Sequence, residues 1–355
     1  MRRHSGLLAF LLVAATFVGL LLTVADRHGD GKRWVAAARP ASVVARSLPV
    51  DGRWLAPDSI FNAPIPRDAP LDPHSAALVA HLAREARRAS TINARRWSTP
   101  VYRVPADQPT VPVRLDVRDA PELQDRLARV PLPPDARAAA GTDGDVVVVQ
   151  AATDTAWELW RMRRDGAGVV RARWAGVVHP LSAHAGAFGD VRGPDGSWRE
   201  RWFWGITAAK LVKLGGLLTA RELATRTIPH ALALATPDAR ARVFAVPAQG
   251  TDGDGGRADA LPEGAHLRLD PRLDLDRLHL PPVTRALAQA AQRYGIVVNN
   301  RTGSTVSFYA EDPHGLGFDP YPQIFGASTP WALAHAFPWE HLQVLRMDLR
   351  TRPRP

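Results

Sequence analysis

Glu158 lies in the segment Trp157-Glu158-Leu159-Trp160, which combines one carboxylate with two indole rings. The segment is typical of a strand, and a period of two would place Glu158 and Trp160 on one face, with Trp157 and Leu159 on the other. A carboxylate beside an indole suits a sugar, because the acid binds hydroxyls while the ring covers the apolar face. Such a Glu can also have a raised pKa and act as a general acid. A surface Glu beside core tryptophans is the alternative that these residues leave open.

Two glycan-directed reactions are compatible with the other polar residues. A glycoside hydrolase needs two carboxylates, about 5.5 Å apart for retention and farther apart for inversion, and Glu158 with Asp143 or Asp270 would supply them. A polysaccharide lyase needs a base and a group that neutralises the uronate, and His230 with Arg268 would suit. A structural role, in which His230 bonds nearby backbone, is the alternative for this histidine.

No motif predicts a metal or a cofactor. The chain has no cysteine, so a disulfide framework, a thiolate nucleophile and cysteine-ligated metals are excluded. His179 and His184 are separated by Pro180, which argues against the helical spacing of a zinc pair. Thr-Asp-Gly-Asp occurs at 142–145 and again at 251–254, but both copies lack the closing Glu of a calcium loop and are explained by turns. We therefore expect neither a metal nor a cofactor.

The N-terminal segment predicts contact with a membrane. Residues 5–25 carry no charge and are mostly apolar, and their helical length is enough to cross a hydrocarbon core of about 30 Å. They are longer than the apolar region of an ordinary signal peptide, usually about 7–15 residues. We expect a single-pass signal anchor in the cell membrane with the following domain outside. Secretion after cleavage near Ala25 is the alternative.

Composition limits the possible partners. The 355 residues are 46% hydrophobic and 23% charged, which is ordinary for a globular protein, and the formal net charge is +10. Only Lys32, Lys210 and Lys213 are lysines, so the positive charge reflects an arginine-rich composition. Trp198, Trp202 and other aromatic residues alternate with arginines, which could bind single-stranded nucleic acid. The expected compartment excludes that partner and favours a polysaccharide or an anionic envelope polymer.

The rest of the chain predicts one large domain. We assign residues 1–25 to the anchor, 26–49 to a stalk, 50–349 to a single β-rich extracytoplasmic domain and 350–355 to a basic tail. Helices are predicted from Pro73 to Ala89, after the Thr219-x-x-Glu222 capping box, and from Pro281 to Gly295.

Most other segments have strand patterns separated by turns. The predicted strands are 101–104, 111–117, 145–150, 156–162, 169–174, 231–235, 242–246, 266–269, 296–298 and 305–310. The loop 299–303 predicts a hairpin between the last two. Many short strands, few helices and 31 prolines favour a mainly β domain, a β-sandwich or jelly-roll-like fold, behind an N-terminal transmembrane helix.

An ordered series of short motifs resembles a widespread family of secreted, β-rich bacterial proteins without a firmly assigned activity. The resemblance covers roughly residues 54–312. The motifs that carry it are Ser59-Ile60-Phe61-Asn62-Ala63-Pro64, Leu214-Gly215-Gly216-Leu217-Leu218 with Glu222, Ile228-Pro229-His230-Ala231-Leu232, Pro262-Glu263-Gly264-Ala265-His266-Leu267-Arg268-Leu269 and Arg293-Tyr294-Gly295-Ile296.

The resemblance implies an extracellular location and a β-rich fold more than a reaction. Relatives often carry Asp-Arg-His where this chain has Asp143-Gly144-Asp145, and Pro-Ala-Arg-His where it has residues 247–250. If those Arg and His residues belong to a site, the site is altered or lost in this chain. Loss of these residues favours binding without catalysis, whereas retention of Glu158, His230 and Arg268 favours chemistry.

Two functions follow as hypotheses. The first is a membrane-anchored protein that binds or modifies cell-envelope or environmental glycan, as a hydrolase or lyase if it is an enzyme. The second is a non-catalytic envelope interaction or structural domain. We expect the three catalytic candidates to converge on one cleft. The candidates are Glu158, His230 and Arg268 for catalysis, and Trp160, Asp143 and Asp270 for substrate binding.

Overall fold

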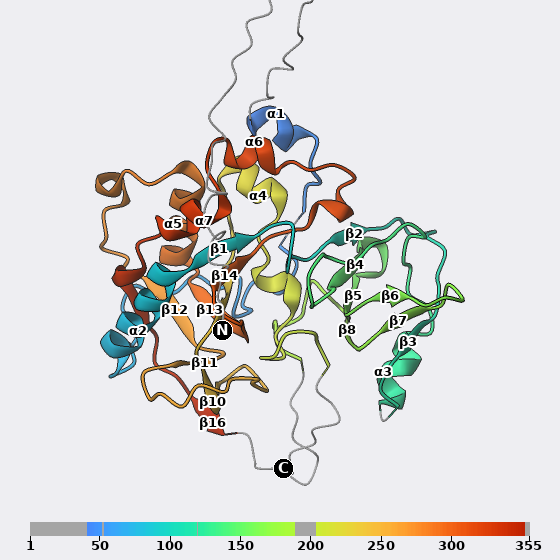
Figure 1. Cartoon of the computed structure of the whole chain (residues 1–355), viewed down its shortest axis with the longest axis horizontal. Helices are drawn as coiled ribbons and strands as arrows, with labels where there is room; N and C mark the ends of the chain where they lie inside the picture. The colour runs from blue at the N-terminus through green and yellow to red at the C-terminus, as the bar shows by residue number, and fades with distance from the viewer. Residues whose placement is uncertain (1–40, 52, 119, 189–203, 352–355) are drawn as a thin grey trace, which may run out of the picture. The chain divides into compact units, whose positions relative to one another are not determined.

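A computed structural model describes residues 41–51, 53–118, 120–188 and 204–351 (Figure 1). In this part of the chain the helices are α1 (Ala41–Arg46), α2 (Ser75–Arg88), α3 (Pro121–Arg126), α4 (Ala220–Thr225), α5 (Pro282–Arg293), α6 (Tyr321–Phe325) and α7 (Pro330–His335). Short 3-10 helices include η1 (Ala151–Thr153), η3 (Lys213–Gly216), η4 (Leu275–Leu278), η5 (Pro313–Gly315) and η6 (Trp339–His341).

The strands dominate the described residues, and the prediction of a mainly β chain is confirmed. They are β1 (Ser90–Asn93), β2 (Val101–Arg103), β3 (Val113–Leu115), β4 (Val146–Gln150), β5 (Thr155–Trp160), β6 (Arg163–Arg164), β7 (Val170–Ala172), β8 (Trp174–Val178), β9 (Leu232–Thr236), β10 (Ala239–Ala245), β11 (Leu261–Glu263), β12 (His266–Leu269), β13 (Ile296–Arg301), β14 (Val306–Tyr309), β15 (Leu342–Val344) and β16 (Leu349–Thr351). They form four sheets that mix parallel and antiparallel pairs.

The largest sheet has the strand order β1-β14-β9-β13-β12-β15. Strand β9 pairs in parallel with β13 and antiparallel with β14, so it lies between them. The predicted hairpin across residues 299–303 is therefore wrong. Strand β13 continues through Asn299 and Asn300 to Arg301, and long-range pairing with β9 replaces a pairing between neighbours in sequence.

The second sheet, β2-β4-β5-β8, shares a hydrophobic core with the first. Strand β4 contributes to this core and to a second one, because its run of four valines is buried on both faces. Val147 and Val149 belong to the core between the two sheets. Val146 and Val148 belong to a separate core under α3 and the third sheet, β3-β7-β6. A strand covered on both sides has a continuous apolar sequence instead of an alternating one.

Helices cover the other face of the six-stranded sheet. Helix α5 contacts β12 and β9, α7 contacts β1, and α2 contacts β15. Leu232 and Leu234 of β9 face this helical side, whereas Ala233 and Ala235 face the second sheet. The alternation of large and small side chains in β9 therefore separates a helix-covered core from a tighter interface between sheets.

The helix predictions that used local end signals are confirmed. Helix α2 lies within the predicted 73–89, and α5 begins at Pro282 and is followed by Gly295 in the left-handed region, with φ +90°. The Thr219–Glu222 capping box is present at the start of α4. Each of these signals acts on backbone groups within the same turn, so the sequence alone is sufficient to identify it.

The folded domain extends beyond the predicted bounds, 50–349, at both ends. Val44 and Leu48 lie in the segment assigned to the stalk, yet they are buried in the helix-covered core. At the other end, β16 (Leu349–Thr351) pairs with β10 and takes in the first residues of the predicted tail. Among the described residues no helix is long and apolar enough to span a bilayer, and the predicted anchor, residues 5–25, lies outside them.

Helix η3 occupies the interface between the two sheets because two of its residues have no side chain. A Cβ on Gly215 would lie 2.3 Å from Cδ2 of Phe61, and a Cβ on Gly216 would lie 2.5 Å from the backbone nitrogen of Ala233. Both distances are shorter than van der Waals contact. The glycines therefore allow η3 to approach β9 closely, and this places the preceding Lys213 side chain between the sheets.

We predict that Gly216→Ala destabilises the chain by about 1–3 kcal/mol, because the new methyl group must displace the backbone of β9. Thermal and urea unfolding of the full chain measure this loss. Gly256→Ala is the matched control, since a Cβ there meets no atom within 4 Å, and its effect should stay within about 0.5 kcal/mol. Equal stability of the two variants would show that η3 is not tightly packed on β9.

Candidate ligand cavity with a buried lysine

A cavity of about 460 Å³ opens near the junction of the two larger sheets. Trp160 of β5 and Trp174 of β8 are directly opposite each other in the antiparallel ladder and form part of its wall. Tyr309 from the end of β14 and Lys213 of η3 contribute from the other sheet's side. The remaining lining residues are Asp143, Asp145, Gly205, Ile206, Thr207, Ala208, Lys210, Phe244, Gln249, Gly250, Thr251, Asp252, Asn300 and Arg301.

The ammonium group of Lys213 lies at the base of this cavity. Its Nζ is 2.8 Å from Oδ2 of Asp145, and the two side chains are 2% and 4% exposed. The same Nζ lies 4.1 Å from the ring centroid of Tyr309. Burial disfavours the charged lysine, but the charge and hydrogen bond of Asp145, together with Tyr309 and Asp143, outweigh burial and raise the pKa of Lys213. Lys213 is therefore a charged group held in the protein interior by one carboxylate and one aromatic face.

Asp145 and Glu158 are neighbouring buried acids with different protonation. Asp145 immediately precedes β4, and Glu158 is opposite Val147 in the β4–β5 ladder, so strand pairing brings them together. Burial raises the pKa of Asp145 to about 6 against the attraction of Lys213. Burial raises the pKa of Glu158 to about 8. At neutral pH Asp145 is mostly ionised and Glu158 is mostly protonated.

The hydrogen bonds of these acids leave one oxygen of each without a partner. Oε1 of Glu158 accepts a hydrogen bond from the backbone N–H of Lys213 at 2.7 Å. Oε2 of Glu158 and Oδ1 of Asp145 are buried and have no hydrogen-bond partner among the described residues. Buried polar atoms are normally paired, and Asp145 lines the cavity, so its Oδ1 is available to a water or ligand there, whereas Glu158 lies behind the wall.

Two further segments contribute Asn300 and Asp252 to the polar wall, and the buried Glu263, which is not a lining residue, holds Asp252. Asn300 Nδ2 donates to the hydroxyl of Tyr309 at 3.2 Å, and Asn300 Oδ1 accepts from the N–H of Ala208 at 2.7 Å. Glu263 Oε2 accepts from the N–H of Asp252 at 2.8 Å. Burial, followed by the nearby charge of Asp252, raises the pKa of Glu263 to about 8.

The structure places the residues predicted from the β5 segment in or beside this cavity. Trp157 and Leu159 face the core under α3, so the expected alternation that puts Glu158 on the opposite face is confirmed. Trp160 and Asp143 line the cavity. Glu158 is fully buried next to the cavity, beside Lys213, rather than on the surface.

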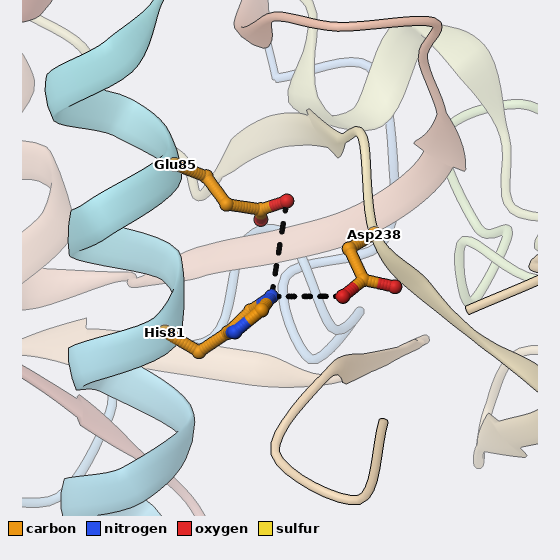
Figure 2. Close-up of side chains that lie close together, drawn as sticks. All are labelled: His81, Glu85 and Asp238. Atoms are coloured by element: carbon orange, nitrogen blue, oxygen red, sulfur yellow. Dashed lines mark ion pairs between the residues drawn. The ribbon is translucent and has the colours of Figure 1, made fainter. Parts of the chain in front are cut away.

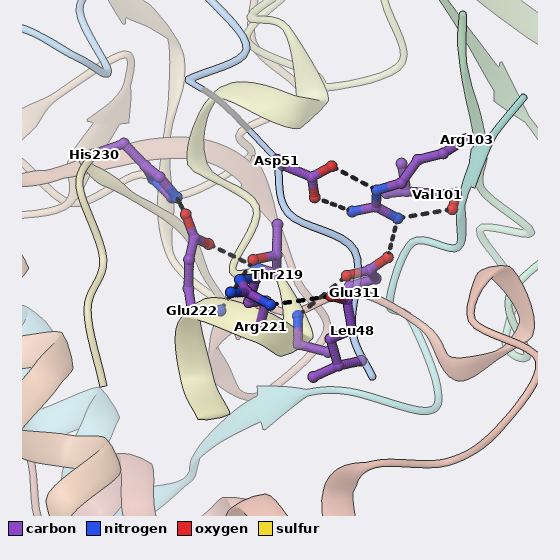
Figure 3. A network of polar contacts seen from close by, with 10 residues as sticks. Leu48, Asp51, Val101, Arg103, Thr219, Arg221, Glu222, His230 and Glu311 are labelled. Atoms are coloured by element: carbon purple, nitrogen blue, oxygen red, sulfur yellow. Dashed lines mark hydrogen bonds and ion pairs between the residues drawn. The ribbon is translucent and has the colours of Figure 1, made fainter. Parts of the chain in front are cut away.

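His230 belongs to a different network, which Figure 3 shows. Its Nε2 lies 3.1 Å from Oε1 of Glu222, and its Nδ1 lies 2.8 Å from the carbonyl oxygen of Ala231. Burial lowers the pKa of His230, but the interactions with Glu222 and the carbonyl of Ala231 together outweigh burial, and the net shift is upward. The other oxygen of Glu222 accepts from the N–H of Thr219 in the capping box. His230 is thus fixed to the start of α4 and borders a space of only about 10 Å³.

The same figure extends to a second buried ion pair. Arg103 donates to both Asp51 and Glu311, and Glu311 also accepts from the N–H of Ala220 at 3.1 Å (Figure 3). This network connects the N-terminal segment, β2 and the start of α4. Its groups are satisfied by one another, so it stabilises the packing of these elements and has no free group directed to a ligand.

Arg268 and Asp270 are also engaged outside the cavity. The guanidinium of Arg268 donates to Gln343 and to the carbonyl oxygens of Pro66 and Arg67. Asp270 accepts from the backbone and side chain of Arg272. In the part of the chain that the structure covers, no hydrogen bond or ion pair joins Glu158, His230 and Arg268. Their convergence on one cleft stays a prediction without support from contacts.

Lys213 and Tyr309 are the residues that sequence reasoning missed. A usable signal was present, because only three of the 45 basic residues are lysines. Lys210 and Lys213, the two lysines within the described residues, both line the cavity. A lysine kept in an arginine-rich chain indicates a position where a compact ammonium group is needed.

A second polar cluster, outside the cavity, could hold a metal ion. His81 and Glu85 of α2 point toward Asp238 from the turn between β9 and β10 (Figure 2). The sequence drew attention to His179 and His184, and this set was not predicted. The i, i+4 spacing of His81 and Glu85 on a helix that was predicted correctly was the available signal.

Comparisons with known proteins add no assignment: no family model, curated protein or solved structure matches the chain. The function has to be argued from the geometry of the site. Segments 143–145 and 247–250, which the sequence analysis singled out, both contribute to the cavity wall through Asp143, Asp145, Gln249 and Gly250.

We predict that Glu158→Gln removes part of the pH dependence of stability. The pKa of Glu158 is raised in the folded chain, so the native state retains a proton that the unfolded state releases above about pH 4.5. Its contribution to the free energy of unfolding is therefore present below pH 4.5 and is lost as the pH rises toward about 8. The free energy of unfolding of the variant should therefore rise relative to that of the wild type, by up to about 1.4 kcal/mol for each pH unit in this interval.

Urea unfolding between pH 5 and 9 measures this difference. Gln retains the oxygen that accepts from Lys213, so the fold should persist. Glu122→Gln, at an exposed position of α3, is the matched control and should follow the wild type at each pH. If Glu158→Gln also ran parallel to the wild type, Glu158 would not be protonated in the native state.

Proposed function

We propose that this chain is a membrane-anchored, extracytoplasmic protein with a β-sandwich-like domain that binds glycan in the cavity between its sheets. The anchor assigned to residues 5–25 and the resemblance to secreted proteins support the location. The shared core between the two larger sheets supports the sandwich-like arrangement. A non-catalytic envelope interaction domain of other specificity is the competing function.

The observation that carries the proposal is the combination of aromatic faces and hydrogen-bonding groups in one cavity. Trp160, Trp174 and Tyr309 contribute aromatic rings, and Gln249 and Asn300 contribute amides. A sugar ring has apolar C–H faces and a rim of hydroxyls, so it needs this pairing of rings with donors and acceptors. The volume of about 460 Å³ falls within the usual range for small ligands, roughly 300–1,000 Å³. It suits a short segment of glycan.

The charge of the lining favours an uncharged glycan. Three acids and three bases line the cavity, so their formal charges cancel: Asp143, Asp145, Asp252, Lys210, Lys213 and Arg301. Lys213 is paired with Asp145, and Arg301 is paired with Asp254 at 3.1 Å. An anionic polymer would need an excess of positive charge, which these ion pairs remove. We therefore propose neutral, hydroxyl-rich glycans as the preferred ligands of the cavity, ahead of anionic envelope polymers.

Hydrolysis is the second candidate, and the divided protonation of Asp145 and Glu158 favours it. Two neighbouring carboxyl groups, one ionised and one protonated at neutral pH, have the protonation states that glycoside hydrolysis requires. Asp145 lines the cavity, whereas Glu158 lies behind its wall. Binding therefore has the stronger support. The lyase hypothesis has weaker support, because His230 and Arg268 are both bound to partners outside the cavity.

We predict that the full chain binds neutral oligosaccharides on a glycan array and that Trp160→Ala weakens the binding of any hit at least tenfold. Loss of an aromatic anchor of this kind costs about 2 kcal/mol, and tenfold in affinity corresponds to about 1.4 kcal/mol. Titration calorimetry with the hit measures the change. Product analysis by mass spectrometry on the same mixture separates binding from hydrolysis.

Trp331→Ala is the matched control. Trp331 is 49% exposed, stacks on His335 and is not part of the cavity wall, so its removal should leave glycan affinity unchanged. Binding only of anionic polymers would contradict the neutral class. Absence of any glycan hit, or equal affinity of the Trp160 and Trp331 variants, would contradict the proposed site.

A further inference from the structure

A second cavity, of about 370 Å³, has His81, Glu85 and Asp238 in its wall. His81 and Glu85 are one turn apart on α2, which places both side chains on the same face of the helix. Asp238 lies in the turn between β9 and β10, so two distant parts of the chain meet here. Figure 2 shows the imidazole directed between the two carboxylates.

The distances among these atoms are compatible with a bound metal ion. Nε2 of His81 is 3.0 Å from Oδ2 of Asp238 and 3.8 Å from Oε1 of Glu85. Tetrahedral ligands with metal–ligand bonds of about 2.0–2.1 Å are separated by about 3.3 Å. The two observed distances bracket that value. One potential ligand atom from each of the three residues lies within 4.8 Å of the others.

An independent observation also points to a ligand. His81 is about nine-tenths buried, and its Nε2 has no hydrogen-bond partner among the described residues despite the nearby carboxylates. A buried ring nitrogen without a hydrogen bond is rare in native proteins. A cation between Nε2 and the two carboxylates would satisfy it.

The surrounding groups hold the three side chains in place. Oγ1 of Thr236 donates to Oε2 of Glu85 at 2.7 Å, leaving the other oxygen of Glu85 directed to His81. Oδ2 of Asp259 lies 3.7 Å from Nδ1 of His81, the position at which a metal-ligating histidine commonly has a carboxylate. Gly255 makes room for Asp238, because a Cβ there would lie 1.9 Å from Oδ1 of that carboxylate.

Three arginines border the same cavity: Arg84, Arg88 and Arg257. Arg84 and Arg257 both pair with Asp259, at 3.5 and 2.8 Å, so part of their charge is compensated within the protein. Arg84 Nη2 also lies 3.3 Å from Nδ1 of His81. Binding of a metal to Nε2 requires Nδ1 to carry the proton and donate to Asp259 in place of this contact.

We propose that His81, Glu85 and Asp238 form a binding site for a divalent transition metal of the zinc type. A mixed set of one imidazole and two carboxylates suits Zn²⁺, and three protein ligands leave a coordination position open to the cavity. The arginines around that position favour an anionic exogenous ligand, a carboxylate or a phosphate. The site lies apart from the glycan cavity and does not depend on it.

The test is Zn²⁺ binding by the full chain after treatment with a chelator and dialysis. Competition with a chromophoric chelator should reveal a single tight site per chain, and Co²⁺ should give visible absorption bands typical of a low-symmetry site. Substitution of a residue that hydrogen-bonds a metal ligand typically lowers the affinity for the metal by about 10–100-fold. Thr236→Val should therefore fall in that range, and His81→Ala and Glu85→Gln should weaken binding by more than 100-fold.

His341→Ala is the control, since His341 is exposed and its removal should leave affinity unchanged. Circular dichroism and thermal unfolding of each variant verify folding, and Glu85→Gln serves if His81→Ala does not fold. Zn²⁺ affinity that is unchanged in both His81→Ala and Glu85→Gln would overturn the proposal. Absence of binding by the wild type at millimolar Zn²⁺ would also overturn it.

Discussion

The buried ammonium group of Lys213 is the interaction on which the packing of the two larger sheets depends. Moving an ammonium ion out of water costs several kcal/mol unless charge and hydrogen bonds compensate for it. Asp145 at 2.8 Å and the ring of Tyr309 provide that compensation. Because Asp145 precedes β4 and Tyr309 ends β14, one side chain connects the two sheets. The glycines of η3 and the alanines of β9 make the approach possible.

The cavity follows from the same arrangement. Lys213 keeps Asp145 at the base, while Trp160 and Trp174 form a wall where β5 and β8 meet. Residues 205–208 and 249–252 of the wall lie outside helices and strands, so the strands and η3 fix only the base and the aromatic wall. These fixed groups favour selective recognition of a small, hydroxyl-rich ligand.

Local end signals predicted α2, α4 and α5, whereas α1, α3, α6 and α7 were not predicted, and long-range pairing limited the strand predictions. The capping box at Thr219 and the glycine after α5 act within one turn, so their meaning does not depend on the rest of the chain. The hairpin across 299–303 failed because β9 inserts between β13 and β14. Strand β1 was missed because Ser90–Asn93 is short and polar and is completed by parallel pairing with β14, which is far away in sequence.

The candidate site was predicted in part for the same reason. Trp160 is the last residue of β5, and the alternation of that strand was sufficient to place it, whereas Asp143 lies in the turn before β4 and stood out by residue type. His230 and Arg268 stood out by residue type, yet their partners, Glu222 and distant carbonyl groups, are visible only in three dimensions. Lys213 could have been found through the rarity of lysine in this chain, a feature of composition and not of pattern.

A double-mutant cycle on Lys213 and Asp145 tests whether the packing of the two larger sheets depends on this ion pair. Urea unfolding of the full chain should show that Lys213→Met and Asp145→Asn each cost about 3–5 kcal/mol, since each leaves the other charge buried and unpaired. The double variant should lose clearly less than the sum of the two, with a coupling of about 1–3 kcal/mol. The exposed Arg163–Asp116 pair should couple by less than about 1 kcal/mol in the same experiment. Additive losses for Lys213 and Asp145, or wild-type stability in Lys213→Met, would contradict this account.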